Sequence, residues 1–284
     1  MVIYNPKDWW KLIFAFHKSD TFRMLLPGIA GVAVFTALVA YIENDFLNAT
    51  FKNTTVIHSL VGFVLSMLLV FRTNSAYDRW WEGRKLWGAL VNNSRNLFLK
   101  INNLVEDEEA KEEIKCLIID FANASKEHLR NGVSINKLSK FSQRNLGQSH
   151  ENIPVQIMDI LFKKIFLALN NHPEKQLNLL IINEELRSFM DILGGCERIK
   201  KTPIPFSYSL FLKKVIFVYI FTMPIGFVRE FGYWASPIVA MIFYVFAGIE
   251  LLAEEIEDPF GTDSNDLPID AICETIRLNL NQIF

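Results

Sequence analysis

The stretch from Val61 to Gly88 reads VGFVLSMLLVFRTNSAYDRWWEGRKLWG, and it decides how the rest of the sequence is interpreted. It begins as an apolar run and continues, without a proline, into a run rich in Arg, Asp, Glu and Trp. The proline-free region extends from Val56 to Phe98 and predicts one continuous helix. Such a helix is roughly 65 Å long, about twice the hydrocarbon thickness of a bilayer. We therefore expect its apolar part in a membrane and its charged part in water.

Three large apolar side chains in this stretch, Phe63, Met67 and Phe71, fall at i, i+4 and i+8 and form a stripe on one helix face. A stripe of this kind more often packs against a neighbouring helix than lines a pore, so packing is the first interpretation. The second interpretation is a narrow apolar constriction in a ring of subunits, which would gate by dewetting. Spacing alone leaves both interpretations open.

The turns that follow this stripe are rich in polar residues. Side chains of this kind, directly after a membrane span, must face water, pair with one another or satisfy neighbouring helix ends. The residues concerned are Arg72, Asn74, Tyr77, Asp78, Arg79, Glu82, Arg84 and Trp87. Ordinary salt bridges and the wall of a water-filled vestibule are both compatible with this composition.

The composition favours an integral membrane protein with a substantial soluble portion. Of the 284 residues, 51% are hydrophobic and 21% are charged, which argues against a bundle buried entirely in lipid. The formal net charge of −2 gives no electrostatic footprint for nucleic acid, so we expect no nucleic-acid partner. Cys116, Cys196 and Cys273 are far apart and odd in number, so we expect free thiols rather than a disulfide framework or a zinc site.

Four segments are predicted to span the membrane: Leu25–Ile42, Val56–Phe71, Val215–Val228 and Tyr233–Ala253. The third of these is interrupted by Pro224. Lys and Arg residues gather before the first span, after the second and before the third, whereas the two other connections have one basic residue each. By the positive-inside rule, both termini are then expected in the cytoplasm.

This topology divides the chain into five segments. Residues 1–24 are expected to form an interfacial amphipathic helix, with Trp9 and Trp10 at the level of the lipid headgroups. The other four segments are membrane helices one and two (25–71), a cytosolic helical region (72–204), membrane helices three and four (205–253), and an acidic turn with a cytosolic helix (254–284).

The cytosolic region is predicted to be helical. Apolar residues at helical spacing indicate one helix that ends at Gly132, a second that begins at Pro154 and a third that ends at Gly194 and Gly195. No stretch shows sustained period-two alternation with turn dipeptides, so the predicted fold class is all-α.

Acidic residues gather after the fourth predicted span, in the stretch EEIEDPFGTDSNDLP at 254–268. Clustered carboxylates and loop carbonyls suit a hard cation such as Ca²⁺, with Glu254, Glu255, Glu257 and Asp258 as the candidate ligands. The stretch lacks the EF-hand pattern, and acidic residues at helix ends are often only caps. A purely structural role is therefore the alternative.

No catalytic motif is found in the sequence. It has no G-x-S-x-G, P-loop, H-E-x-x-H or dinucleotide-binding fingerprint, and its five His residues are scattered without ligand spacing. We therefore expect that the protein is not an enzyme.

Three separated motifs, in the same order, resemble the bestrophin family and especially its bacterial branch. They are FRTNSAYDRWWEGRKLWG (71–88), LGGCERIKKTPIPFSYS (193–209) and EEIEDPFGTDSNDLPID (254–270). The resemblance extends over nearly the whole chain. It implies a homopentameric ion channel in the lipid of a bacterial inner membrane, with four membrane helices per subunit and one axial pore.

The resemblance also implies roles for particular residues. The hydrophobic neck of the family matches Phe63, Met67 and Phe71, and the softer thioether of Met67 stands where bacterial relatives commonly have a branched aliphatic residue. Leu177 is the best match for the single apolar side chain of the cytosolic aperture. Animal members bind Ca²⁺ where Glu254, Glu255, Glu257 and Asp258 lie, but PFGT breaks the acidic run here.

The resemblance leaves the permeating ion open, because animal members conduct chloride and bacterial relatives have been described as passing monovalent cations. We slightly favour monovalent cations, with a chloride channel of the same architecture as the alternative and with no required cofactor. Two other classes are a membrane carrier and a non-conducting membrane scaffold. A carrier would be favoured by inverted repeats or paired broken spans, and neither is evident in the sequence.

Overall fold

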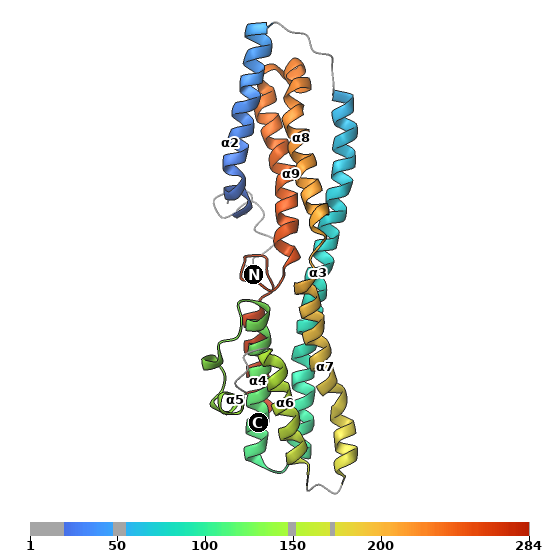
Figure 1. Cartoon of the computed structure of the whole chain (residues 1–284), viewed down its shortest axis with the longest axis vertical. Coiled ribbons are helices and arrows are strands. Elements are labelled where there is room, and N and C mark those ends of the chain that lie inside the picture. Colours follow the sequence, from blue (N-terminus) through green and yellow to red (C-terminus); the bar gives the residue numbers. More distant parts are fainter. Residues whose placement is uncertain (1–19, 48–54, 147–151, 171–173, 284) are drawn as a thin grey trace. The chain divides into compact units, whose positions relative to one another are not determined.

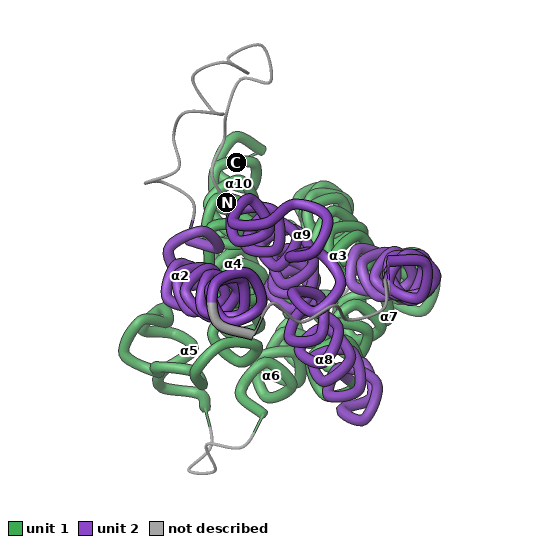
Figure 2. The backbone as a smooth tube through the Cα atoms, turned by 90° about the horizontal axis from the view of Figure 1, so that it is seen from above, with its two compact units in different colours: residues 1, 79–202, 258–284 green, residues 2–78, 203–257 purple. Residues whose placement is uncertain are grey.

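The computed structural model describes residues 20–47, 55–146, 152–170 and 174–283. Every element in these ranges is helical, which confirms the all-α prediction. The chain divides into two compact units, coloured separately in Figure 2: residues 79–202 with 258–284, and residues 2–78 with 203–257. The predicted interfacial helix, including Trp9 and Trp10, lies outside the described residues as far as residue 19.

One helix, α3 (Thr55–Leu104), contributes residues to both units. It runs for 50 residues without a break, which confirms the single long helix predicted between Val56 and Phe98. The absence of proline and the strong helix formers in its second half account for this continuity.

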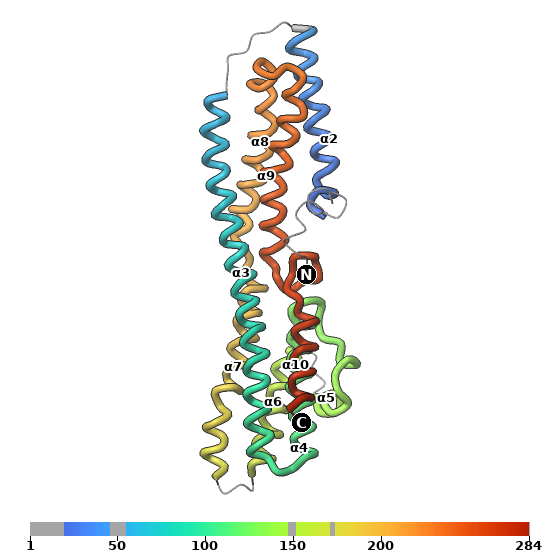
Figure 3. Tube along the Cα trace, turned by 180° about the vertical axis from the view of Figure 1, so that it is seen from behind, coloured from blue at the N-terminus to red at the C-terminus, as the bar shows by residue number. Residues whose placement is uncertain are grey.

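The unit of residues 2–78 and 203–257 is a bundle of apolar helices (Figures 1 and 3). Its other elements are α2 (Asp20–Tyr41), the π-helix η2 (Ile42–Leu47), α8 (Phe206–Phe231), the 3₁₀-helix η4 (Gly232–Trp234) and α9 (Ala235–Glu257). Helix α9 packs against both α2 and α8. The buried core of the bundle comes from α3, α8 and α9, and consists of Leu65, Leu69, Leu212, Ile216, Tyr219, Ile220, Met223 and Val239.

Among the described residues, three helical stretches are long and apolar enough to cross a membrane: Asp20–Asp45, Thr55–Leu104 and Phe206–Glu257. The first two contain the predicted first and second spans. The third contains both remaining predicted spans, because η4 joins α8 to α9 with only a short interruption. A left-handed backbone at Gly232 (φ +53°) ends α8, and glycine adopts this conformation without steric cost.

Pro224 does not interrupt the third predicted span, contrary to the prediction. Helix α8 continues through it to Phe231, and Met223 and Pro224 are both buried in the bundle. Proline is tolerated inside a membrane helix because neighbouring helices support the backbone that it leaves without a hydrogen bond.

The unit of residues 79–202 and 258–284 is a second helical bundle with a larger core. Its elements besides α3 are α4 (Glu108–Leu129), η3 (Ile135–Lys137), α5 (Lys140–Asn145), α6 (Ile153–Ala168), α7 (Lys175–Lys201) and α10 (Ile269–Ile283). Helix α4 packs against α6 and α10 (Figure 3). The largest fully buried apolar side chains of this core are Trp87, Phe98, Phe121, Phe189 and Phe260.

Two of the predicted helix boundaries in this unit are confirmed. Helix α4 ends at Leu129, and the positive φ of Gly132 (+93°) lets its N–H donate to the carbonyl of Glu127 at 2.9 Å. Pro154 lies in the first turn of α6, where its missing N–H leaves no helix hydrogen bond unmade.

The predicted end of α7 at Gly194 and Gly195 is wrong, because the helix continues to Lys201. A Cβ at position 195 would lie 2.9 Å from Cδ1 of Leu86 on α3. Gly195 therefore allows α7 to approach α3 closely, whereas a glycine at a helix end would adopt positive φ. The three cysteines are free thiols, as predicted.

Candidate pore-lining site

The apolar half of α3 has a buried face and an exposed face. His58, Leu65, Leu69, Arg72 and Ala76 recur at intervals of three or four residues, or multiples of these, and all are at most 9% exposed. This periodicity gives α3 one seam along which it packs in its own unit. The opposite face is therefore free to contact lipid, another subunit or a pore.

Phe63, Met67 and Phe71 lie on that opposite face, with 66%, 46% and 58% of their surfaces exposed. The stripe is thus not the face by which α3 packs against α8 and α9. Since none of the three side chains has a polar oxygen or nitrogen, the stripe offers an ion no replacement for its hydration shell. An arrangement of this kind can act as a barrier whose wetting determines whether ions pass.

The first basic residue after the stripe, Arg72, lies on the buried face and is 1% exposed. Its Nη2 donates to Oε2 of Glu257 at 2.6 Å, and the other carboxylate oxygen of Glu257 accepts from the backbone N–H of Ile204 at 2.5 Å. The Nε and Nη1 atoms of Arg72 are buried without a hydrogen-bond partner in the described part of the chain. The guanidinium of Arg72 therefore lies in the interior of the chain and not on the face of the Phe63, Met67 and Phe71 stripe.

The remaining residues of the polar run also fall into two groups, one held by contacts within the protein and one exposed. Arg79 donates to the backbone carbonyls of Ile199 and Thr202, and Trp87 is 1% exposed in the core of its unit. Glu82 pairs with Arg198 at 2.5 Å. Asn74, Tyr77, Asp78 and Arg84 are instead exposed.

The acidic segment after α9 forms ion pairs. Glu254 pairs with Lys213 at 2.8 Å and Asp258 pairs with Lys200 at 2.5 Å, while Glu257 is held by Arg72. The described residues contain no group of three or more His, Cys, Asp or Glu side chains arranged to hold a metal ion. A Ca²⁺ ion bound by Glu254, Glu257 and Asp258 would have to displace these three basic partners. Calcium binding by this segment stays a prediction.

Sequence reasoning did not predict that Glu250 and Glu254 share Lys213 as a basic partner. Glu250 is 5% exposed on α9, and Nζ of Lys213 on α8 lies 4.0 Å from its Oε1. Lys213 thus lies between Glu250 and Glu254. The spacing of Glu250 and Glu254 on one helix face was visible in the sequence, but the basic residue that pairs with both lies on another helix.

Leu177, the predicted aperture residue, lies in the first turns of α7 and is 54% exposed. Leu180 and Ile181, one turn further along, are also exposed, at 73% and 43%. The assignment of Leu177 therefore still depends on the resemblance alone.

The chain matches a family described as "Bacterial/Fungal Bestrophin protein" over residues 1–282. A voltage-dependent anion channel-forming protein of Nostoc sp. is 37% identical over 291 residues, covering 98% of this chain and 92% of that protein. The voltage-dependent anion channel-forming protein YneE of Escherichia coli K12 is 32% identical over 293 residues, covering 100% of this chain and 94% of that protein.

Solved structures agree with these sequence matches. The crystal structure of a bacterial bestrophin homologue from Klebsiella pneumoniae has a TM-score of 0.84 at 26% identity, and covers 91% of this chain and 98% of that one. A single-site mutant of the same homologue also has a TM-score of 0.84 at 26% identity, with coverage of 92% and 98%. Together with the apolar helices, these matches show that the chain is a membrane protein of the bacterial and fungal bestrophin family of ion channels.

Proposed function

We propose that the chain forms a homopentameric channel that passes monovalent ions across the bacterial inner membrane, through a neck built from Phe63, Met67 and Phe71 of each subunit. The observation that supports this proposal most strongly is the exposure of the three side chains on a candidate membrane helix whose other face is buried in its own unit. Around an axis, five copies of the stripe would close into an apolar ring that gates by dewetting. The names of the relatives, which refer to channel-forming proteins, agree with ion conduction.

We further propose that α2, the first part of α3, α8 and α9 each cross the membrane. Thr55 at the start of α3 donates to Glu230 near the end of α8 at 3.0 Å, and Tyr233 donates to Asp45. The ion pair of Arg72 follows the apolar first part of α3, and the ion pair of Lys213 lies in the first turns of α8. Both lie away from the Thr55 and Glu230 contact, at the other end of these apolar stretches. Basic residues at this second end support a cytoplasmic location for it, and hence for both termini.

Selectivity for cations is supported by Asp78, which falls at helical spacing after Phe71 on the face of the proposed neck. Its carboxylate is exposed and has no hydrogen bond or ion pair among the described residues. The adjacent Arg72 and Arg79 are instead held by Glu257 and by backbone carbonyls. A ring of such carboxylates attracts cations and repels anions. The names of the relatives favour anions, and Lys85 is the next charge at this spacing, so anion conduction is the second candidate.

Leu177 is proposed as the apolar side chain of a second constriction, in the unit of residues 79–202 and 258–284. Its exposure on α7 is compatible with this role.

Recording from the purified protein in a planar bilayer tests conduction and distinguishes the classes. We expect Met67→Ala to increase the current at a given voltage, because a smaller side chain widens the apolar barrier and lowers the cost of wetting it. Met241→Ala on α9 is the control, since Met241 is 68% exposed but lies on another helix. A scaffold would give no current in the unaltered protein or in Met67→Ala. In a carrier, the transport rate would saturate with substrate concentration, and Met67→Ala would not increase the current.

The sign of the reversal potential in a salt gradient tests selectivity. For the unaltered protein, we expect the reversal potential to have the sign of the cation's equilibrium potential. For Asp78→Asn, we expect it to shift towards the anion's equilibrium potential, because the ring of Asp78 carboxylates loses its charge. Asp159→Asn, which removes an exposed carboxylate from α6, should leave the potential unchanged. A reversal potential with the sign of the anion's equilibrium potential in the unaltered protein would establish anion conduction instead.

A further inference from the structure

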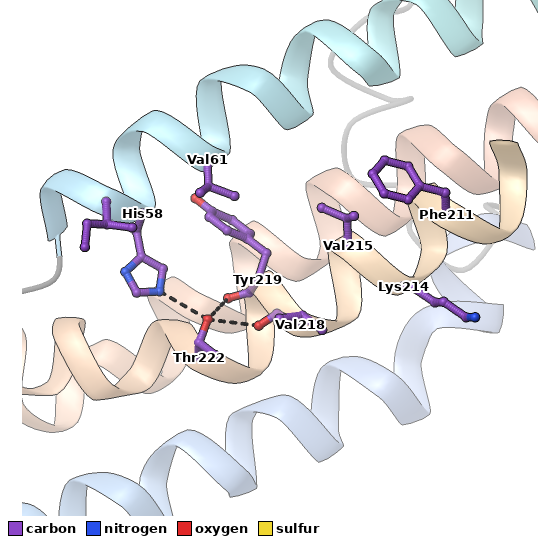
Figure 4. Close-up of a pocket in the computed structure, with 9 residues that line it drawn as sticks. His58, Val61, Phe211, Lys214, Val215, Val218, Tyr219 and Thr222 are labelled. Atoms are coloured by element: carbon purple, nitrogen blue, oxygen red, sulfur yellow. Dashed lines mark hydrogen bonds between the residues drawn. The ribbon is translucent and has the colours of Figure 1, made fainter.

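A groove with a volume of about 600 Å³ runs between the first turns of α3 and helix α8, within one unit (Figure 4). Most of its lining is apolar, and includes Ile57 and Val61 from α3 and Val215 and Val218 from α8. A volume of this size is typical of sites for small organic ligands. Since both helices belong to candidate membrane spans, the groove can be filled by a lipid chain or by a helix of another subunit.

The two ends of the groove differ in polarity. At one end, the side chains of His58 and Thr222 form a hydrogen bond of 3.3 Å, and the Thr222 hydroxyl also donates to the carbonyl of Val218 at 2.9 Å (Figure 4). These polar groups are therefore satisfied within the protein. At the other end lies Lys214, which is exposed and has no ion-pair partner among the described residues. The preceding residue, Lys213, pairs with Glu254.

The length of the groove matches one leaflet of a bilayer. From Phe211 to Thr222 along α8, the helical rise gives roughly 16 Å, and half of the hydrocarbon thickness is about 15 Å. The basic end of the groove lies where α8 begins, among the lysines that precede the span. An acyl chain that entered here would place its headgroup beside Lys214.

We infer that this groove binds one acyl chain of a phospholipid whose anionic headgroup pairs with Lys214. Basic pockets between membrane helices on the cytoplasmic side are suited to anionic headgroups, while the apolar walls replace neighbouring lipid tails. The charge of Lys214 favours an anionic lipid in the groove over a helix from a second copy of the chain. An apolar helix seated in the groove would cover the ammonium group without supplying a counter-charge, which is unfavourable.

The close contact between α3 and α8 at Gly62 forms the inner wall of the groove, against which the acyl chain would lie. A Cβ at position 62 would lie 2.6 Å from the hydroxyl oxygen of Tyr219, so glycine at this position lets the hydroxyl end of the ring reach α3. Tyr219 is 7% exposed and lines the groove. The wall is thus a packed part of the core and does not need a ligand to form.

Native mass spectrometry of the full-length protein, released from a neutral detergent, tests the inference. The probes are phosphatidylglycerol and phosphatidylcholine with identical acyl chains, added in equal amounts. We expect phosphatidylglycerol to be retained roughly fivefold more than phosphatidylcholine, the factor that one lysine near an anionic lipid provides. Lys214→Gln should remove this preference, because it removes the charge and keeps most of the side-chain length.

Val218→Trp should abolish retention of both lipids by filling the groove. Phe217→Trp is the matched control, since Phe217 is the adjacent residue, is similarly exposed (64% against 57%) and does not line the groove. Equal retention of the two lipids by the unaltered protein would overturn the inference, as would normal retention by Val218→Trp. Loss of subunit association in Val218→Trp without loss of lipid would show that a second copy occupies the groove.

Discussion

Arg72 is a charged residue on the buried face of α3, in the unit of residues 2–78 and 203–257. It lies on the same face of α3 as Leu65 and Leu69, so a hydrophobic pattern would call for an apolar side chain there. Its ion pair with Glu257 and the hydrogen bond from Ile204 to the same carboxylate fix the end of α9 against the start of α8. A buried pair of this kind is sensitive to the loss of either partner.

We predict that Glu257→Gln lowers the free energy of unfolding by about 3–5 kcal/mol, because it leaves the guanidinium of Arg72 buried without a counter-charge. Thermal denaturation of the detergent-solubilised protein measures the loss. The control is Asp159→Asn, which breaks an exposed i, i+4 pair with Lys163 and should change stability by under about 0.5 kcal/mol. Equal losses of unfolding free energy for the two substitutions would show that the buried ion pair stabilises the protein no more than the exposed pair does.

At the residue scale, the sequence predicted which positions are polar but not what they contact. Arg72 was expected to pair or to face water, and Glu257 was expected to be a calcium ligand. The structure joins them as an ion pair across 185 residues of sequence, and no local pattern predicts a contact of that range. Lys213 and Glu250 were missed as partners for the same reason.

At the scale of elements, hydrophobic periodicity predicted the helices correctly. The end of α7 was predicted wrongly, because Gly194 and Gly195 were interpreted as a helix end. The continuity of α3 follows from a long stretch without proline, which is a local property. The continuation of α7 through Gly194 and Gly195 depends instead on how close α3 approaches, and only the packed structure gives this distance.

We predict opposite effects for alanine at these two adjacent glycines. Gly194→Ala should raise the free energy of unfolding by about 0.5–1 kcal/mol, because its Cβ would meet no atom within 4 Å and alanine favours the helix. Gly195→Ala should lower it by about 1–3 kcal/mol, since its Cβ would overlap the side chain of Leu86. Chemical denaturation of both variants compares them, and stabilisation by both would contradict the close approach.

At the scale of the whole molecule, the resemblance of three motifs predicted the family, and the comparisons confirm it over the full chain. The assignment of Phe63, Met67 and Phe71 to a neck has a different basis. Helical spacing places them on one face, and the structure shows that this face is not the packing seam of α3. The proposed pore would be formed by several subunits, so a single chain does not test it.

Block of the current by Cd²⁺ in the Met67→Cys channel tests the proposed neck most directly, because a ring of thiolates binds this soft metal ion. The native thiols should not respond: burial raises the pKa of Cys196 and of Cys273 to about 12, and it also raises the pKa of Cys116. Met241→Cys, exposed on α9, is the control. We predict that Cd²⁺ blocks Met67→Cys reversibly and leaves Met241→Cys and the unaltered channel conducting. Undiminished current through Met67→Cys in the presence of Cd²⁺ would contradict a neck at this position.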